Sequence, residues 1–103
     1  MLVSKEYEEN AIVCFKMVNG DEIVGKIVDA RDDAFLVHRP CTVVPSQQGF
    51  GLLQSLITGD INTNVTLKKQ HVIMHAPVIK EMEAHYIQTT TGIAPVPRSG
   101  IIT

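Results

Sequence analysis

The Asn19-Gly20 dipeptide, which lies between two apolar runs, is the sequence feature that most restricts how this chain can fold. In a two-residue loop, Asn-Gly favours a type I′ turn, in which both central residues have positive φ. This turn joins antiparallel strands because its twist matches theirs. The sequence therefore predicts a β-hairpin of residues 12–18 with residues 21–29.

The first strand of this hairpin is apolar on both faces. Val13 and Phe15 alternate with Ile12 and Cys14, and alternate side chains of a strand point to opposite faces. A strand covered on both sides indicates a closed or sharply curled sheet, or a partner chain. Gly25, in the middle of the second strand, indicates a bend, a bulge or a close backbone approach, each of which curls a sheet; the alternative is an incidental weak point.

The rest of the chain predicts three more strands. A charged turn at residues 31–33 precedes the third strand, which Pro40 interrupts unless residues 41–44 continue at a sheet edge. A turn-rich break follows at residues 45–51. The five expected strands are residues 12–18, 21–29, 34–39, 65–69 and 71–76.

The remaining segments predict a loop, a helix and a tail. Residues 52–58 fit either a strand or a helical turn, and residues 59–64 fit a loop. Pro77 suits the first turn of a helix at about residues 78–91. Residues 93–103 are expected to form an extended tail without a core of its own.

Length and charge limit the class of protein and the partners. The 103 residues suffice for one domain, residues 1–103, with an ordinary core. The formal net charge is -2, so any nucleic-acid site has to be a local basic patch. No apolar run approaches the ~18 residues of a membrane span, and the polar N-terminal residues do not resemble a signal peptide. We therefore expect a cytoplasmic protein with no membrane contact.

The residues predict no enzyme, no metal site and no cofactor. Cys14 and Cys41 lie singly in apolar strands and are expected to be small buried hydrophobic residues. His71 and His75 would lie about 13 Å apart along a strand that rises 3.3 Å per residue, which is too far for one ion. The serines lie in no nucleophile motif.

Two stretches resemble the two motifs of the Sm-like (LSm) family. Asn19, Gly20, Gly25 and Ile27 match the spacing of the first motif. Residues 69–77, which begin Lys-Gln-His, are similar to the Lys-His turn and final strand of the bacterial Hfq branch. The added helix is similar to that of small Sm-like proteins of tailed phages and marine microbes.

The resemblance implies a mainly β fold, a small, five-stranded, strongly bent Sm-like barrel at about residues 11–77 followed by a C-terminal helix. It also implies that copies of the chain assemble into a homo-oligomeric ring by pairing their edge strands, an arrangement that leaves no unpaired edge. The chain would then be a ring-forming protein without enzymatic activity.

The resemblance further implies single-stranded RNA as a partner, bound at the ring pore by two turns, residues 31–35 and 68–71. The implied RNA-binding residues are Phe35 as a platform on which a base stacks, Arg31 in the same turn, Lys68 and Lys69 on phosphates, and Gln70 or His71 on a base edge.

The first of these turns departs from the family pattern. Arg31 stands where the family has an aspartate, and Asp32 and Asp33 follow it. Leu36 replaces an asparagine that contacts the base in the family. These departures favour an alternative function, a structural or protein-interaction module that has the Sm-like fold and binds no RNA. In that alternative Phe35 is a core residue, and the lysines belong to a solvated turn.

Overall fold

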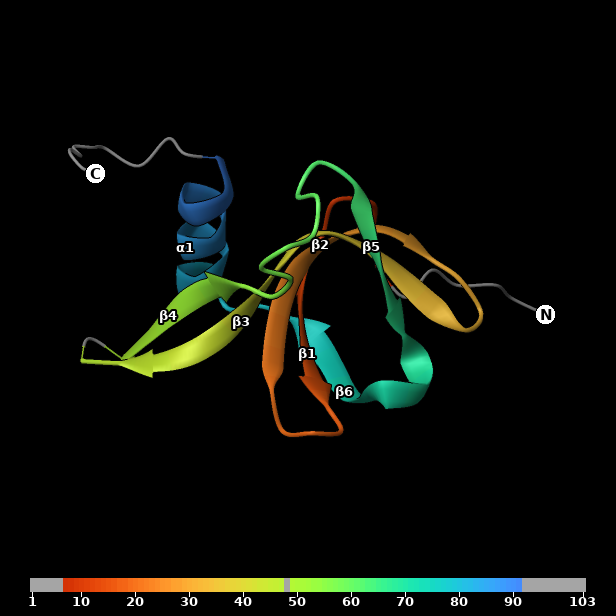
Figure 1. The fold of residues 1–103 in the computed structure, drawn as a ribbon, viewed down its shortest axis with the longest axis horizontal. Coiled ribbons are helices and arrows are strands. Elements are labelled where there is room, and N and C mark those ends of the chain that lie inside the picture. Colours follow the sequence, from red (N-terminus) through yellow and green to blue (C-terminus); the bar gives the residue numbers. More distant parts are fainter. Residues whose placement is uncertain (1–6, 48, 92–103) are drawn as a thin grey trace.

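The computed structural model describes residues 7–47 and 49–91, which form a mainly β fold with one C-terminal helix (Figure 1). The predicted tail at residues 93–103 lies outside the described residues. The elements are β1 (Ile12–Met17), β2 (Glu22–Ala30), β3 (Ala34–Ser46), β4 (Gly49–Gln54), β5 (Asn64–Lys68), a 3-10 turn (Lys69–His71), β6 (Val72–Pro77) and α1 (Lys80–Thr91).

The strands form one strongly bent antiparallel sheet in the order β4-β3-β2-β1-β6, and β5 also pairs with β3. β5 lies along the first half of β3, with Ala34 opposite Lys68. β4 lies along the second half, with Cys41 opposite Gln54. Since β2 occupies the other side of β3, β4 and β5 are two parts of one sheet edge, separated by the loop of residues 55–63.

The predicted first hairpin is confirmed, but its turn differs from the prediction. Gly20 has φ of +97°, whereas Asn19 is not among the described residues with positive φ. The Met17 N–H donates to the Asp21 carbonyl at 2.8 Å, which closes a three-residue loop, and within it the Gly20 N–H donates to the Met17 carbonyl at 2.9 Å. The Asn19 side chain accepts a hydrogen bond from the Asp21 N–H at 3.0 Å. Asn19 therefore stabilises the turn through its side chain. Of the two residues Asn19 and Gly20, only Gly20 adopts the left-handed conformation.

Gly25 is required because another strand crosses close to it. A Cβ atom at this position would lie 2.1 Å from Cγ1 of Val37, a residue with no exposed surface. The pairing of β2 with β3 also shifts register between Val24 and Lys26. Gly25 therefore lies at a bulge in the β2–β3 pairing, as one of the predicted alternatives has it, and the side chain of Val37 fills the space beside it.

The prediction that both faces of the first strand are covered is also confirmed. The curled inner face holds the inner cluster, which consists of Val13, Phe15, Ile27, Phe35 and Val37. The opposite face packs against α1 and holds the helix-side cluster, which consists of Ile12, Val24, Cys41, Met82 and Tyr86. Cys41 is buried, as expected for a small hydrophobic residue, whereas Cys14 is only partly buried and packs against the helix-side cluster.

The predicted count of five strands is wrong, whereas the alternative that the third strand continues past Pro40 is confirmed. The sheet has six strands because β3 continues through Pro40 to Ser46 and forms a hairpin with β4. Arg39 has φ of +51°, and β2 pairs with His38 and then with Cys41. Pro40 therefore sits in a bulge, where the ladder does not need its missing N–H.

The helix begins later than predicted. Pro77 is the last residue of β6, opposite Val13. The Val78 N–H still donates to the Ile12 carbonyl at 3.2 Å, so residue 78 remains bound to β1. The helix can begin only after this contact, at Lys80.

Two polar contacts fix α1 to the bend of β3. The Tyr86 hydroxyl donates to the His38 carbonyl at 2.6 Å, and the Arg39 guanidinium donates to the Thr90 carbonyl in the last turn of the helix. A cation at this end of a helix is favourable because the carbonyl groups there carry partial negative charge. Burial raises the pKa of Tyr86 to about 12.

Candidate functional site

The two turns that were predicted to bind RNA meet at one end of the sheet. The Lys69 N–H donates to the Asp33 carbonyl at 3.0 Å, and Lys68 pairs with Ala34. We call residues 31–35 and 68–71 the turn cluster. It brings together the six predicted site residues, which are Arg31, Phe35, Lys68, Lys69, Gln70 and His71.

Phe35 lies in the core of the turn cluster and not on its surface. Its side chain has 0% exposure. Its ring centroid lies 5.2 Å from that of Phe15, 5.1 Å from that of His75 and 6.5 Å from that of Tyr7, and Lys69 Nζ lies 4.7 Å from the centroid. The prediction of a stacking platform is therefore wrong for this arrangement, because no ring face is open to a base.

The aromatic residues around Phe35 are not predicted by the sequence patterns. His75 stands opposite Phe15 in the pairing of β1 with β6, and its Nδ1 forms a hydrogen bond of 2.6 Å with the Tyr7 hydroxyl. Once β1 and β6 are recognised as neighbours, the alternation of β6 places His75 on the inner face. Tyr7 lies in a polar segment that gives no such signal.

The basic side chains of the turn cluster have partners of their own. Arg31 Nε lies 3.2 Å from Asp29 Oδ2, and Lys68 Nζ lies 3.8 Å from Asp33 Oδ2. All four side chains are more than half exposed, so the pairs add little stability. They do, however, offset much of the positive charge that a phosphate would meet.

Gln70 and His71 are the exposed polar residues of the 3-10 turn. Gln70 Nε2 lies 3.3 Å from His71 Nε2. The two side chains thus present adjacent hydrogen-bonding groups at the surface, as an edge of an unpaired base requires.

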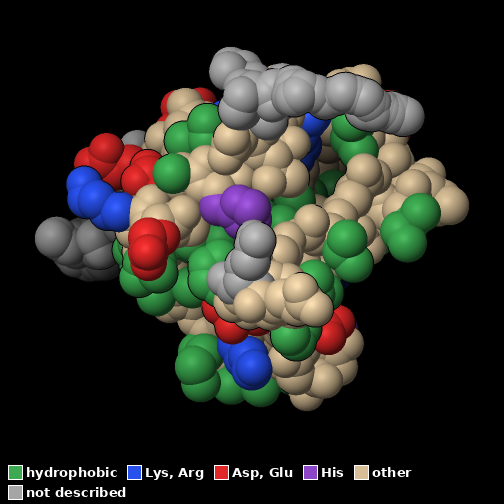
Figure 2. All heavy atoms as spheres, turned by 90° about the vertical axis from the view of Figure 1, so that its left-hand side faces the viewer, with side chains coloured by type: hydrophobic (Ala, Val, Ile, Leu, Met, Phe, Trp, Pro, Cys, Tyr) green, Lys and Arg blue, Asp and Glu red, His purple; other side chains and the backbone are tan. Residues whose placement is uncertain are grey.

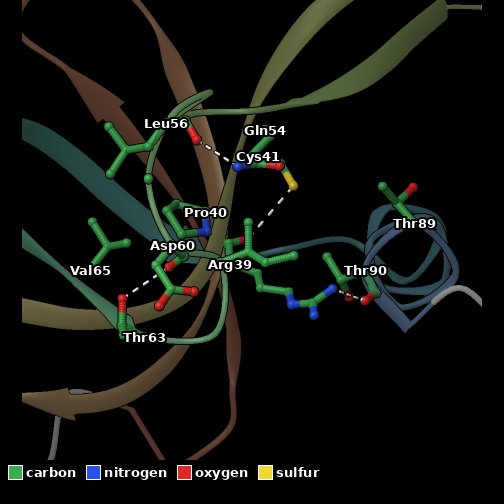
Figure 3. A pocket seen from close by; sticks show the side chains of 12 residues that line it. Arg39, Pro40, Cys41, Gln54, Leu56, Asp60, Thr63, Val65, Thr89 and Thr90 are labelled. Carbon is green, nitrogen blue, oxygen red and sulfur yellow. Dashed lines mark hydrogen bonds between the residues drawn. The ribbon is translucent and has the colours of Figure 1, made fainter.

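A pocket of about 100 Å³ lies away from the turn cluster, between the bend of β3, the loop of residues 55–63 and the last turn of α1 (Figure 3). No local sequence pattern indicates this pocket, because its walls come from segments far apart in the chain. Its lining residues are Arg39, Pro40, Cys41, Gln54, Leu56, Gly59, Asp60, Ile61, Thr63, Val65, Thr89 and Thr90.

The chemistry of the pocket does not favour catalysis. Burial raises the pKa of the Cys41 thiol, which keeps it protonated and a poor nucleophile at neutral pH. Within residues 7–47 and 49–91, His, Cys, Asp and Glu form no group of three that could hold a metal ion. The pocket is also smaller than the roughly 300 Å³ of a typical small-molecule site, so it fits a single side chain better than a substrate.

Comparison with known proteins adds no relative to these observations. No protein-family model matches the chain, and no curated protein is significantly similar to it in sequence. In the described part of the chain, α1 is too short and too polar to cross a membrane. The sheet edges, the turn cluster and the pocket are therefore the features that bear on function.

Proposed function

We propose that this chain is a non-enzymatic, Sm-like subunit that assembles with further copies of itself into a closed ring. The observation that carries the proposal is the pair of open edges of the bent sheet. Among the described residues, β6 pairs with β1 alone, and β4 and β5 pair with β3 alone. Each outer edge therefore presents backbone N–H and C=O groups that another strand can bind.

Pairing of β6 in one copy with β5 in the next covers the β6 edge and the β5 part of the opposite edge by one repeated contact. Such a contact joins different surfaces of the two subunits, so it closes into a ring when the rotation between subunits divides a full turn. β6 carries Ile73 and Met74, which are 56% and 62% exposed. Exposed apolar side chains on an edge strand favour aggregation of a lone subunit, and a closed ring covers that edge. The motif spacing of Asn19, Gly20 and Gly25 supports the same family of assemblies.

Substitution of Met74 by lysine tests the ring. Light scattering of the wild-type chain at micromolar concentration should give one homo-oligomer of defined mass. Met74→Lys should give mainly monomer, because a charge on the edge opposes strand addition. The matched control is Ile87→Lys, on an exposed position of α1, which should keep the oligomer. A monomeric wild-type chain would refute the proposal.

The second candidate function is weak binding of single-stranded RNA by the turn cluster. The observation in its favour is that Lys68, Lys69, Gln70 and His71 gather beside Arg31 at one end of the sheet. In a ring, this end would be repeated once per subunit. Because Asp29 and Asp33 offset part of the charge, we expect low affinity and strong salt dependence. Phe35 has no direct role in this candidate function.

Fluorescence anisotropy with U-rich and A-rich oligonucleotides at two salt concentrations tests RNA binding. Asp33→Asn should raise the affinity because it releases Lys68 from its carboxylate partner. Lys68→Ala should lower the affinity and reduce the salt slope by about one. Glu81→Gln, the same charge change on α1, is the control and should have no effect. If the wild-type ring binds neither oligonucleotide at low salt, the RNA hypothesis fails and the structural module remains.

A further inference from the structure

The pocket between β3, the loop of residues 55–63 and α1 has no role in ring assembly or RNA binding as proposed above. Its apolar walls come from Pro40, Leu56, Ile61 and Val65. Such a lining in a cavity of about 100 Å³ suits one aliphatic side chain.

The loop beside the pocket is unusually apolar for an exposed segment. Leu56, Ile57 and Ile61 are 50%, 86% and 37% exposed, and all three lie within nine residues. Figure 2, which views the end of the molecule that carries β4 and α1, shows hydrophobic side chains reaching the surface among polar ones. Exposed apolar side chains gathered around a pocket are typical of a binding surface.

The polar groups of the pocket give it a negative edge. Asp60 is exposed, and its carboxylate accepts a hydrogen bond from the Asn62 N–H at 2.9 Å. Within the described part of the chain, Asp60 forms no ion pair. The one basic residue of the lining, Arg39, extends its guanidinium away from Asp60 toward Thr90 (Figure 3). A ligand with one positive charge and aliphatic side chains would complement this surface.

The chain itself supplies such a ligand directly beside the pocket. Thr89 and Thr90 line the pocket, so the segment that follows Thr91 starts at its edge. This segment, residues 92–103, reads GIAPVPRSGIIT. Its one charged side chain is Arg98, and it is rich in aliphatic residues. Twelve residues span up to about 40 Å when extended, which is ample for a return to the adjacent pocket.

We propose that residues 92–103 bind back onto the pocket of their own chain, where an aliphatic side chain of residues 93–96 fills the cavity and Arg98 pairs with Asp60. The segment contains Pro95 and Pro97, and a residue that precedes proline generally disfavours helical backbone, which lowers the entropy lost on docking. The tether provides an effective concentration in the millimolar range, so modest contacts are sufficient. This inference does not depend on the ring.

Hydrogen exchange measured by mass spectrometry tests the docking. Removal of residues 92–103 should accelerate exchange across residues 55–63. Asp60→Arg and Arg98→Asp should each accelerate it by roughly two- to fivefold, the range of an exposed ion pair. The double variant Asp60→Arg/Arg98→Asp should restore protection. Unchanged exchange in the truncated chain, or no recovery in the double variant, would overturn the proposal.

Two isoleucines of the same loop provide a matched control. Ile61 lines the pocket and Ile57 does not. Ile61→Asp should reproduce the effect of the truncation on the amides around Thr63 and Thr90, whereas Ile57→Asp should leave these amides protected. Equal effects of the two substitutions would show that the pocket is not the binding site.

A mixed sample separates docking within one chain from docking between copies. Isotope-labelled chain without residues 92–103 is mixed with an excess of unlabelled full-length chain. If the tail binds its own chain, exchange in the labelled chain stays fast at every ratio. Protection of the labelled loop would mean that the tail binds a neighbouring copy, which contradicts the proposal.

Discussion

At the scale of single residues, Gly25 has the least room for a side chain among the described glycines. Gly25→Ala would bring a Cβ atom against the buried Val37 side chain, and such overpacking costs about 1 to 3 kcal/mol. Chemical denaturation should show a loss of this size. Gly51→Ala is the control, since a Cβ atom at residue 51 would lie 3.8 Å from Val44 Cγ2, which is an ordinary van der Waals contact. A Gly25→Ala chain as stable as the wild type would contradict the account of the bend.

Tyr86 should make the protein sensitive to alkali. Burial raises its pKa from 10.0 to about 12. The folded state therefore keeps a proton that the unfolded chain loses. The associated stability is fully present below about pH 10 and is lost as pH rises through 12, by on the order of 2 kcal/mol. Denaturation between pH 9 and 12 measures this loss.

Two phenylalanine variants assign the alkaline loss to one hydroxyl. Tyr86→Phe should abolish the additional loss above pH 10, although it costs about 1 to 3 kcal/mol at neutral pH because the His38 carbonyl loses its donor. Tyr7→Phe retains Tyr86 and should retain the alkaline loss. Persistence of the loss in Tyr86→Phe would assign it to another group.

At the scale of elements, the bend of β3 combines an unfavourable backbone conformation with a favourable contact. Arg39 adopts φ of +51°, which costs a residue with a Cβ atom about 1 to 2 kcal/mol. Its guanidinium offsets this cost by binding the C-terminal turn of α1.

Comparison of Arg39→Gly with Arg39→Ala separates the two effects. Both variants lose the contact with the Thr90 carbonyl, but only glycine is free of the conformational strain. Arg39→Gly should therefore be about 1 kcal/mol more stable than Arg39→Ala in thermal or chemical denaturation. Equal stability of the two variants would mean that the backbone at residue 39 is not strained.

At the scale of the whole molecule, the local signals predicted the start of the sheet well. Asn19-Gly20 placed the first hairpin, and Gly25 and the two-sided β1 indicated a curled sheet. The hairpin of β3 with β4 was missed because Pro40 suggested an end to the strand, whereas a bulge accommodates it. A bulge depends on the register between neighbouring strands, which sequence periodicity does not report.

The location of the turn cluster was predicted, whereas Phe35 was named as an RNA-binding residue although its side chain is buried. The two turns of the turn cluster do meet. Phe35 is buried because Tyr7 and His75, which are 68 residues apart in the chain, pack beside it. The pocket was not predicted because β3, the loop of residues 55–63 and α1 form it only after the sheet has bent. Long-range contacts of this kind leave no local pattern.

The division of one sheet edge into β4 and β5 has a consequence for how this protein can diverge. Each strand is held by its own pairing with β3, so the loop between them does not set the register of either. The entropy of closing a flexible loop rises by only about 0.6 kcal/mol for each doubling of its length. Residues 55–63 can therefore gain or lose sequence while the sheet stays intact, which makes this loop the natural place for related chains to acquire different binding preferences.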